Sequence, residues 1–166
     1  IPVTGVIPYV RLDIDEEDSL SEKLDRHTAA GRIDAAVIRV PHISNFTDFG
    51  MLEGCEEVSV RYVRTAGELG NPDLLLLPGS KNTMADLLWM RENGLEARIQ
   101  KLAVSGCRIM GICGGYQMLG NRLEDPDGVE HGGQMAGLGL LPVVTRFRGS
   151  KHRTRVEGKV KKLSGV

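Results

Sequence analysis

Aromatic residues and net charge are both scarce in this sequence. Phe, Trp and Tyr together make up 4% of its 166 residues, and the formal net charge is −1 at pH 7. So few aromatic rings offer no platform on which nucleic-acid bases could stack. A net charge near zero also gives no long-range attraction to a phosphate backbone or to an anionic lipid surface. We therefore expect no nucleic acid and no membrane among the partners of this protein.

Long apolar runs and cysteines are also few. No apolar run approaches the length of a membrane span, and the N-terminus lacks the pattern of a signal peptide. The three cysteines, Cys55, Cys107 and Cys113, form no C-x-x-C pair. An odd number of cysteines argues against a disulfide framework, and their spacing argues against a zinc site or a thioredoxin-like redox site. These absences predict a cytoplasmic protein without a metal site.

The apolar segments that are present predict an open α/β fold. The chain length and the hydrophobic content of 41% suit one domain with a sizeable core. Short apolar or alternating runs predict four strands, at residues 35–40, 58–63, 73–77 and 108–112. Helical periodicity and capping residues predict helices at residues 47–53 (N-cap Thr47, stop Gly54), 83–92 and 94–105, and another from Gly115. Strands that alternate with helices favour a largely parallel sheet flanked by helices.

Both ends of the chain depart from this pattern. Residues 1–31 contain an acidic run at residues 13–18 and are typical of a solvated linker. Residues 121–139 are rich in glycine, which predicts surface loops. Residues 140–145 and 153–160 alternate as in the start of a β-hairpin. We therefore expect a fold that is truncated at its C-terminus.

A cysteine between two glycines is the most informative feature of the chain. Gly111, Cys113 and Gly115 have the spacing of a nucleophile elbow, and they follow a predicted strand and precede a predicted helix. Such a turn is strained, so its neighbours must be small. The helix N-terminus favours the thiolate, and the N–H of Gly114 can bind an oxyanion. The alternative is that Cys113 is a small buried hydrophobe in a glycine-rich turn.

A second glycine-bearing turn, Pro-Gly-Ser at residues 78–80, follows the predicted strand at residues 73–77. The carboxyl ends of parallel strands meet at one edge of a sheet, and active sites of open α/β folds form there. We therefore expect this turn and the cysteine elbow to line one pocket.

The general base that a cysteine nucleophile needs is not evident in the sequence. The four histidines are His27, His42, His131 and His152. None stands in the local sequence context expected for a histidine paired with an orienting carboxylate. We therefore expect the base to lie beyond Val166.

The turn at residues 78–80, the Cys113 elbow, and Gln117 four residues after the cysteine resemble class I glutamine amidotransferase domains. More narrowly, residues 39–49 (Arg-Val-Pro-His-Ile-Ser-Asn-Phe-Thr-Asp-Phe) and 77–83, together with the elbow, resemble the cobyric acid synthase family. The resemblance covers nearly the whole chain. It implies a class I glutamine amidotransferase-like fold with flavodoxin-like layers.

The resemblance also implies roles for individual residues. Cys113 would attack the side-chain amide of glutamine, form a γ-glutamyl thioester and release ammonia. The N–H groups of Gly79 and Gly114 would form the oxyanion hole, and Gln117 and Ser80 would hold the glutamine.

For the complete enzyme, the resemblance implies two domains. Residues 1–31 would connect an upstream ATP-dependent synthetase domain to an amidotransferase domain at residues 32–166, incomplete at its C-terminus. ATP and Mg²⁺ would act in the synthetase domain, on side-chain carboxylates of the corrinoid adenosylcobyrinic acid a,c-diamide in cobalamin biosynthesis. The present chain has no G-x-x-x-x-G-K-[ST] phosphate loop, so we expect no cofactor in it. Alone, it is expected to show little or no glutaminase turnover.

Three alternatives stay open. The chain could belong to another amidotransferase, either cobyrinic acid a,c-diamide synthase or an enzyme that amidates a cell-wall lipid precursor. It could be an amidotransferase-like scaffold that binds a partner and has no activity. It could also be a hydrolase with a cysteine elbow, since such elbows recur across different chemistries.

Overall fold

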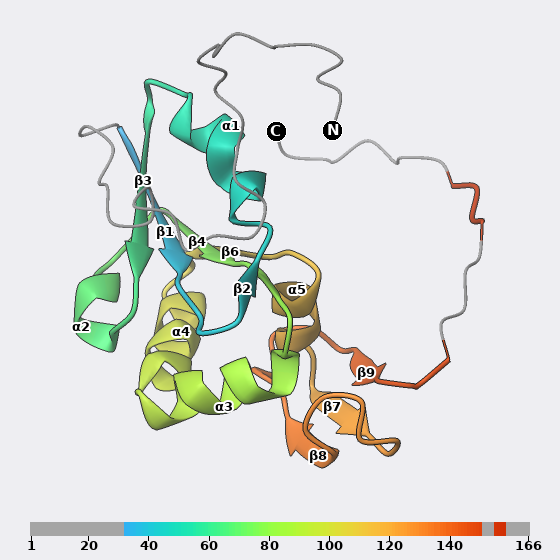
Figure 1. Cartoon of the computed structure of the whole chain (residues 1–166). Coiled ribbons are helices and arrows are strands. Elements are labelled where there is room, and N and C mark those ends of the chain that lie inside the picture. The colour runs from blue at the N-terminus through green and yellow to red at the C-terminus, as the bar shows by residue number, and fades with distance from the viewer. Residues whose placement is uncertain (1–31, 151–154, 159–166) are drawn as a thin grey trace, which may run out of the picture.

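The structure is a computed structural model that describes residues 32–150 and 155–158, apart from the side chain of Phe46. The expected connector at residues 1–31, with its acidic run and His27, lies outside these residues, as does His152. Figure 1 shows a central group of strands with helices on both sides and a separate, smaller group of strands. The division into a connector and a domain stays a prediction.

Four strands form the central sheet, and all their pairings are parallel, as predicted. β1 (Ile33–Ile38), β3 (Val58–Val63), β4 (Leu74–Leu77) and β6 (Arg108–Gly111) lie in the order β3-β1-β4-β6. Counting only these strands, the order is 2-1-3-4, which is typical of flavodoxin-like sheets. The order of the strands reverses beside β1, and ligands bind such sheets at the carboxyl ends next to this reversal. A ligand site is therefore expected at the loops that follow β1 and β4.

Three helices cover one face of this sheet: α3 (Thr83–Glu92), α4 (Leu95–Val104) and α5 (Gly114–Met118) (Figure 1). Successive strand residues point to opposite faces, and alternate ones pack here against the helices. The break predicted between α3 and α4 is confirmed, because Gly94 adopts a φ of 72° there. The buried cluster on this face includes Ala36, Ile38, Leu75, Leu77, Met84, Leu87, Met90, Leu95, Ile99, Leu102 and Met118.

A smaller apolar cluster covers the other face. The 3-10 helix η2 (Phe46–Phe49) and helix α1 (Gly50–Glu53) lie over it, and Phe49 is 1% exposed. The Phe49 ring meets the Tyr62 ring edge to face, with centroids 6.3 Å apart. The buried strand residues of this cluster are Ala35, Val37, Val60 and Leu76. The sheet is therefore buried on both faces, which explains why its strands are nearly continuous apolar runs.

The N-cap predicted for the helix at residues 47–53 is wrong. Two short helices occupy this segment, and the first is preceded by Asn45, not Thr47, as its N-cap. Asn45 has φ 52° and ψ 47°, a left-handed conformation that asparagine tolerates better than most residues. Gly54 ends the second helix, as predicted.

One short helix, α2 (Ala66–Leu69), was not predicted from the sequence. Its N-cap Thr65 accepts a hydrogen bond from the Glu68 N–H at 3.2 Å, and the Glu68 carboxylate accepts bonds from two backbone N–H groups in return. This is a capping box, for which a Thr-x-x-Glu pattern is the sequence signal. A bond from the Arg64 N–H lowers the pKa of the Glu68 carboxyl.

The prediction of surface loops at residues 121–139 is wrong. This segment contains β7 (Arg122–Asp125) and β8 (Gly133–Ala136), which pair antiparallel. β9 (Val144–Arg146) pairs with β7 in parallel, so the segment at residues 140–145 does not start the predicted hairpin. Strands of three or four residues with glycine among them carry too little alternation to be recognised. Residues 155–158 form no strand, and the rest of the expected second strand, at residues 153–154 and 159–160, lies outside the described residues.

The loop between β7 and β8, residues 126–132, is held by one buried carboxylate. Asp125 is 0% exposed and accepts hydrogen bonds from four backbone N–H groups at 2.8–3.0 Å. Burial raises the pKa of the Asp125 carboxyl, but these bonds lower it by more, so the pKa lies below its ordinary value. The donors are Val129, Glu130, His131 and Gly132.

Acid is expected to loosen this loop. Because the folded-state pKa of Asp125 lies below the ordinary value of 3.8, the ionised carboxylate stabilises the fold above that pH. The contribution is lost as the pH falls through the folded-state pKa. Hydrogen exchange should show that the amides of residues 129–132 are protected at pH 7 and lose protection below about pH 4. Asp125→Asn should lose this protection at pH 7, whereas Asp127→Asn, in the same loop, should keep it; protected amides in Asp125→Asn would refute the role of the carboxylate.

Candidate active site

Cys113 lies at the turn between β6 and α5, with φ 49° and ψ −109°. Only Asn45 shares a positive φ with it among the described residues that are not glycine. A cysteine in this conformation is strained, and strain of this kind gathers at functional sites. The residue is exposed. The alternative of a small buried hydrophobe is therefore wrong, and the sequence correctly predicted a strained turn.

The glycines of the elbow are required by close backbone contacts. A Cβ atom at Gly115 would lie 2.1 Å from the Leu77 carbonyl oxygen, at the end of β4. A Cβ atom at Gly111 would lie 2.6 Å from the backbone of Gly115. Both distances are far below van der Waals contact, so only glycine fits. The elbow is thus packed directly against the end of the neighbouring strand.

The loop after β4 contains a short strand that was predicted only as a turn. β5 (Gly79–Ser80) pairs antiparallel with β2 (Ile43–Ser44), which lies in the loop after β1. A Cβ atom built on Gly79 would lie 3.9 Å from the Cβ atom of Cys113. The structure therefore brings the 78–80 loop and the elbow together, as expected from their places in the sheet.

The two backbone N–H groups of β5 face different neighbours. The Lys81 N–H donates to the His42 carbonyl at 2.9 Å, which makes Ile43–Ser80 the pair without direct hydrogen bonds. The next pair, Ser44 and Gly79, is then a hydrogen-bonded pair, so the Gly79 N–H points toward Ser44. The N–H of Ser80 lies on the side of the elbow, since a Cβ atom on Gly114 would be 3.0 Å from the Ser80 nitrogen.

Gln117, on α5, is oriented by a residue that sequence reasoning did not single out. The Thr83 hydroxyl, 1% exposed at the start of α3, donates to the Gln117 side-chain oxygen at 3.3 Å. Thr83 and Gln117 are 34 residues apart, so no local pattern could reveal the contact. The bond holds the Gln117 amide oxygen toward Thr83. The amide NH₂ group therefore points away from Thr83.

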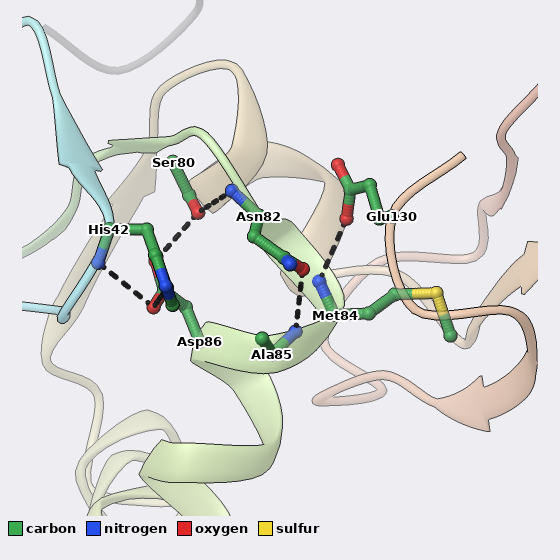
Figure 2. Close-up of polar contacts among 7 residues, drawn as sticks. All are labelled: His42, Ser80, Asn82, Met84, Ala85, Asp86 and Glu130. Carbon is green, nitrogen blue, oxygen red and sulfur yellow. Dashed lines mark hydrogen bonds and ion pairs between the residues drawn. The ribbon is translucent and has the colours of Figure 1, made fainter. Parts of the chain in front are cut away.

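One histidine has a carboxylate partner that the sequence did not reveal. His42 Nδ1 lies 2.8 Å from Asp86 Oδ1, and the two side chains are 50% and 0% exposed (Figure 2). His131 lies in the 126–132 loop, where its backbone N–H donates to Asp125 at 3.0 Å. In the part of the chain that the structure describes, no side chain hydrogen-bonds the Cys113 sulfur. The position of the general base therefore stays a prediction.

The 126–132 loop also contacts the helix that borders the elbow. The Glu130 carboxylate accepts a hydrogen bond from the Met84 N–H at 3.0 Å, in the first turn of α3 (Figure 2). An acidic group is favourable at this end of a helix. A cavity of about 490 Å³ lies elsewhere, on the small sheet, lined by Asn121, Arg122, Gln134, Met135, Ala136 and Val144.

Two kinds of feature are absent from the described residues. No three of their His, Cys, Asp and Glu side chains are grouped as a metal ion would require. None of the helices there has both the length and the apolar character needed to cross a bilayer.

Comparison with known proteins finds similarity to a glutamine amidotransferase domain family and to cobyric acid synthases. Residues 34–165 match the family described as the CobB/CobQ-like glutamine amidotransferase domain. The chain is 58% identical over 166 residues to a cobyric acid synthase of Ruminiclostridium cellulolyticum, covering 100% of this chain and 32% of the relative. It is 53% identical over 163 residues to a cobyric acid synthase of Moorella thermoacetica, covering 96% of this chain and 32% of that relative. The chain thus spans about a third of the length of these relatives.

A solved structure with the same fold has also been found. It is described as a glutamine amidotransferase and matches with a TM-score of 0.52 at 22% sequence identity, over 68% of this chain and 55% of the other. At this identity the likeness supports the fold alone, and it agrees with the predicted parallel sheet flanked by helices.

Proposed function

Because the chain belongs to the family of CobB/CobQ-like glutamine amidotransferase domains, we propose that it is the ammonia-releasing module of a cobyric acid synthase. The observation that carries the proposed chemistry is the exposed, strained Cys113 beside the 78–80 loop. An exposed sulfur at such a turn can be reached by a substrate amide, as a nucleophile must be.

The reaction we propose is the hydrolysis of the side-chain amide of glutamine. The Cys113 thiolate attacks the amide carbon, a C–S bond forms, and the carbonyl oxygen becomes an oxyanion. The tetrahedral intermediate collapses, the C–N bond breaks, and the nitrogen leaves as ammonia after taking up a proton. Water then attacks the γ-glutamyl thioester, which releases glutamate and restores the thiol.

Backbone N–H groups are the proposed oxyanion donors. The Gly114 N–H stands at the start of α5, directly after the nucleophile. From the 78–80 loop we propose Gly79 as a second donor, which requires its N–H to turn away from Ser44. The Ser80 N–H already lies on the side of the elbow and is an alternative second donor. Donors fixed before the reaction stabilise the charge that develops on the oxygen without reorganisation.

Two side chains are proposed to hold the glutamine substrate. The Thr83 hydroxyl occupies the amide oxygen of Gln117, so the Gln117 NH₂ group is available to an acceptor on the substrate. Ser80 lies in the loop against Gly114, next to the nucleophile. Ser80 and the Thr83 hydroxyl that holds Gln117 both lie about 3 Å from the position of a Cβ atom on Gly114, the residue after the nucleophile, which supports the assignment.

In the complete enzyme, we propose that the ammonia passes to a synthetase domain in the two thirds of the relatives' length that this chain does not span. There, ATP and Mg²⁺ would activate side-chain carboxylates of adenosylcobyrinic acid a,c-diamide for amidation. The free thiols of Cys55, Cys107 and Cys113 fit a reducing compartment such as the cytoplasm, where we place the enzyme. We expect the 166-residue chain alone to turn over little glutamine.

Covalent labelling with a glutamine analogue tests the proposal. 6-Diazo-5-oxonorleucine should form one adduct per chain, on Cys113, and excess glutamine should slow the labelling. Cys55 and Cys107 are internal controls, because a glutamine site has no reason to bring the reagent to them, and burial raises the pKa of the Cys107 thiol. Mass spectrometry of the digested protein would locate the adduct. A protein without label at Cys113 would favour the scaffold alternative, and labelling that glutamine does not slow would favour the cysteine hydrolase.

A further inference from the structure

A buried carboxylate near the elbow joins two loops, and Figure 2 shows its contacts with His42 and Ser80. Asp86 lies in the first turns of α3 and is 0% exposed. Its Oδ1 atom accepts the His42 backbone N–H at 3.1 Å and contacts His42 Nδ1 at 2.8 Å. Its Oδ2 atom accepts the Ser80 hydroxyl at 2.6 Å. One side chain therefore ties the loop after β1 and the loop after β4 to the same helix.

The Ser80 hydroxyl is fixed from two sides. It donates to Asp86 and accepts a hydrogen bond from the Asn82 N–H at 3.0 Å. The Lys81 N–H donates to the His42 carbonyl at 2.9 Å, so the backbone that follows Ser80 is also held in place. A hydroxyl whose donor and acceptor partners are both fixed has one orientation, and it fixes the backbone that carries it.

The loop fixed in this way is in contact with the elbow. A Cβ atom on Gly114 would lie 3.1 Å from the Ser80 Cβ and 3.0 Å from the Ser80 nitrogen, so there is no spare room between the two segments. Oxyanion donors act at about 2.7–3.1 Å from the oxygen, and a displacement of a few tenths of an ångström weakens them. The shape of the 78–80 loop therefore bears directly on the proposed site.

Asp86 is not required to cap its own helix. The Asn82 side chain accepts the Ala85 N–H at 3.1 Å, and Glu130 accepts the Met84 N–H at 3.0 Å (Figure 2). These two groups satisfy donors of the first turn of α3 that would otherwise lack partners. Both carboxylate oxygens of Asp86 are used instead on loops from other parts of the chain, at Ser80 and at His42.

We propose that Asp86 is a positioning residue, which acts through Ser80 to hold the 78–80 loop in the shape that presents the Ser80 N–H to the oxyanion at Cys113. The inference rests on the proposed function and adds to it a residue that does not touch the substrate. A carboxylate is suited to the task because both of its oxygens can accept hydrogen bonds, and here they face two donors of His42 and one of Ser80. An asparagine keeps one acceptor oxygen and turns an NH₂ group toward the donors of His42 or Ser80, which leaves at least one of them unpaired.

Two reagents that modify the Cys113 sulfur distinguish a loss of loop positioning from a general loss of protein stability. The diazoketone 6-diazo-5-oxonorleucine has a carbonyl group that can use the oxyanion donors, whereas iodoacetamide alkylates Cys113 by displacement of iodide and needs only an exposed sulfur. In Asp86→Asn, we expect labelling of Cys113 by the diazoketone to slow by about 10- to 100-fold at saturating reagent, while labelling by iodoacetamide stays within about 2-fold of wild type. The concentration for half-maximal labelling should change little, because Gln117 and Ser80, the side chains proposed to hold the substrate, are both kept in Asp86→Asn.

Ser80→Ala keeps the test decisive if Asp86→Asn does not fold. It removes only the hydroxyl. At saturating reagent, where a lost contact with the reagent no longer limits the rate, Ser80→Ala should slow the diazoketone by roughly 5-fold with the iodoacetamide rate unchanged. Asp34→Asn is the matched control: that carboxylate also holds a partner, Arg61, at 2.7 and 2.9 Å, but at the amino end of β1, away from the site. The ratio of the two rates should be unchanged in Asp34→Asn.

The outcomes distinguish the inference from the proposed function. If the wild-type protein reacts with iodoacetamide at Cys113 but not with the diazoketone, the proposed function fails. If the wild-type protein reacts with both, and Asp86→Asn or Ser80→Ala keeps the wild-type ratio of rates, the proposed function stands and the inference is overturned. A selective loss of the diazoketone reaction in these variants supports both.

Discussion

Replacing Cys113 with alanine in the complete synthase is expected to abolish amidation from glutamine and to leave amidation from added ammonia near its wild-type rate. Alanine has no nucleophile, so no γ-glutamyl thioester can form. Loss of a nucleophile lowers turnover by a factor on the order of 10⁴ or more. Free ammonia does not need this site, because it enters the reaction after glutamine hydrolysis. Rates measured with saturating glutamine and with ammonium salts would show the difference.

Cys107→Ala is the matched control for this substitution. It also removes one free thiol, but from a position whose sulfur contacts the Pro72 carbonyl at 3.2 Å, away from the elbow. Both activities should persist in this variant. Glutamine-dependent amidation by Cys113→Ala at more than about 1% of the wild-type rate would refute the role of the nucleophile.

Replacing Gly115 with alanine is expected to cause a large loss of stability. The new Cβ atom would lie 2.1 Å from the Leu77 carbonyl oxygen, a backbone atom at the end of β4 that cannot rotate away. The elbow and the strand must separate, which costs about 3 kcal/mol or more. For a chain of this size, that loss corresponds to a fall in Tm of roughly 6–12 °C. Thermal unfolding followed by circular dichroism would measure it.

Gly67→Ala provides the comparison. Gly67 lies in α2, and a Cβ atom there would be 4.0 Å from its nearest neighbour, the Thr65 hydroxyl oxygen. Alanine is favoured over glycine within a helix, so this variant should be as stable as wild type or more stable by up to about 1 kcal/mol. Equal Tm values for the two variants would show that the elbow is not held as tightly as its geometry indicates.

The parallel sheet and the elbow could be predicted because their signals are local. Each central strand is a short apolar run, since the sheet is buried on both faces, and each run ends at turn residues. The elbow is encoded by Gly111, Cys113 and Gly115 within five positions. Contacts of the 78–80 loop with the elbow followed from one general rule, that parallel strands end at the same edge.

The rest of the site depends on contacts between distant residues. Asp86 and His42 are 44 residues apart, and Thr83 and Gln117 are 34 apart, so nothing near either residue indicates its partner. The small sheet was missed for another reason. Its strands have three or four residues, and the turn between β7 and β8 depends on one buried side chain, Asp125, whose surface or interior position a sequence does not reveal.

The positive φ of Cys113 brings the stability of the turn and the reactivity of the site into conflict at a single position. Glycine is the residue that adopts φ 49° and ψ −109° with least cost, so a glycine at this position would relax the turn and remove the sulfur at the same time. Selection for heat resistance alone would therefore act against the nucleophile, and only selection for turnover retains it. A thermostable version of this domain is best sought at positions remote from the elbow, with activity assayed at every round.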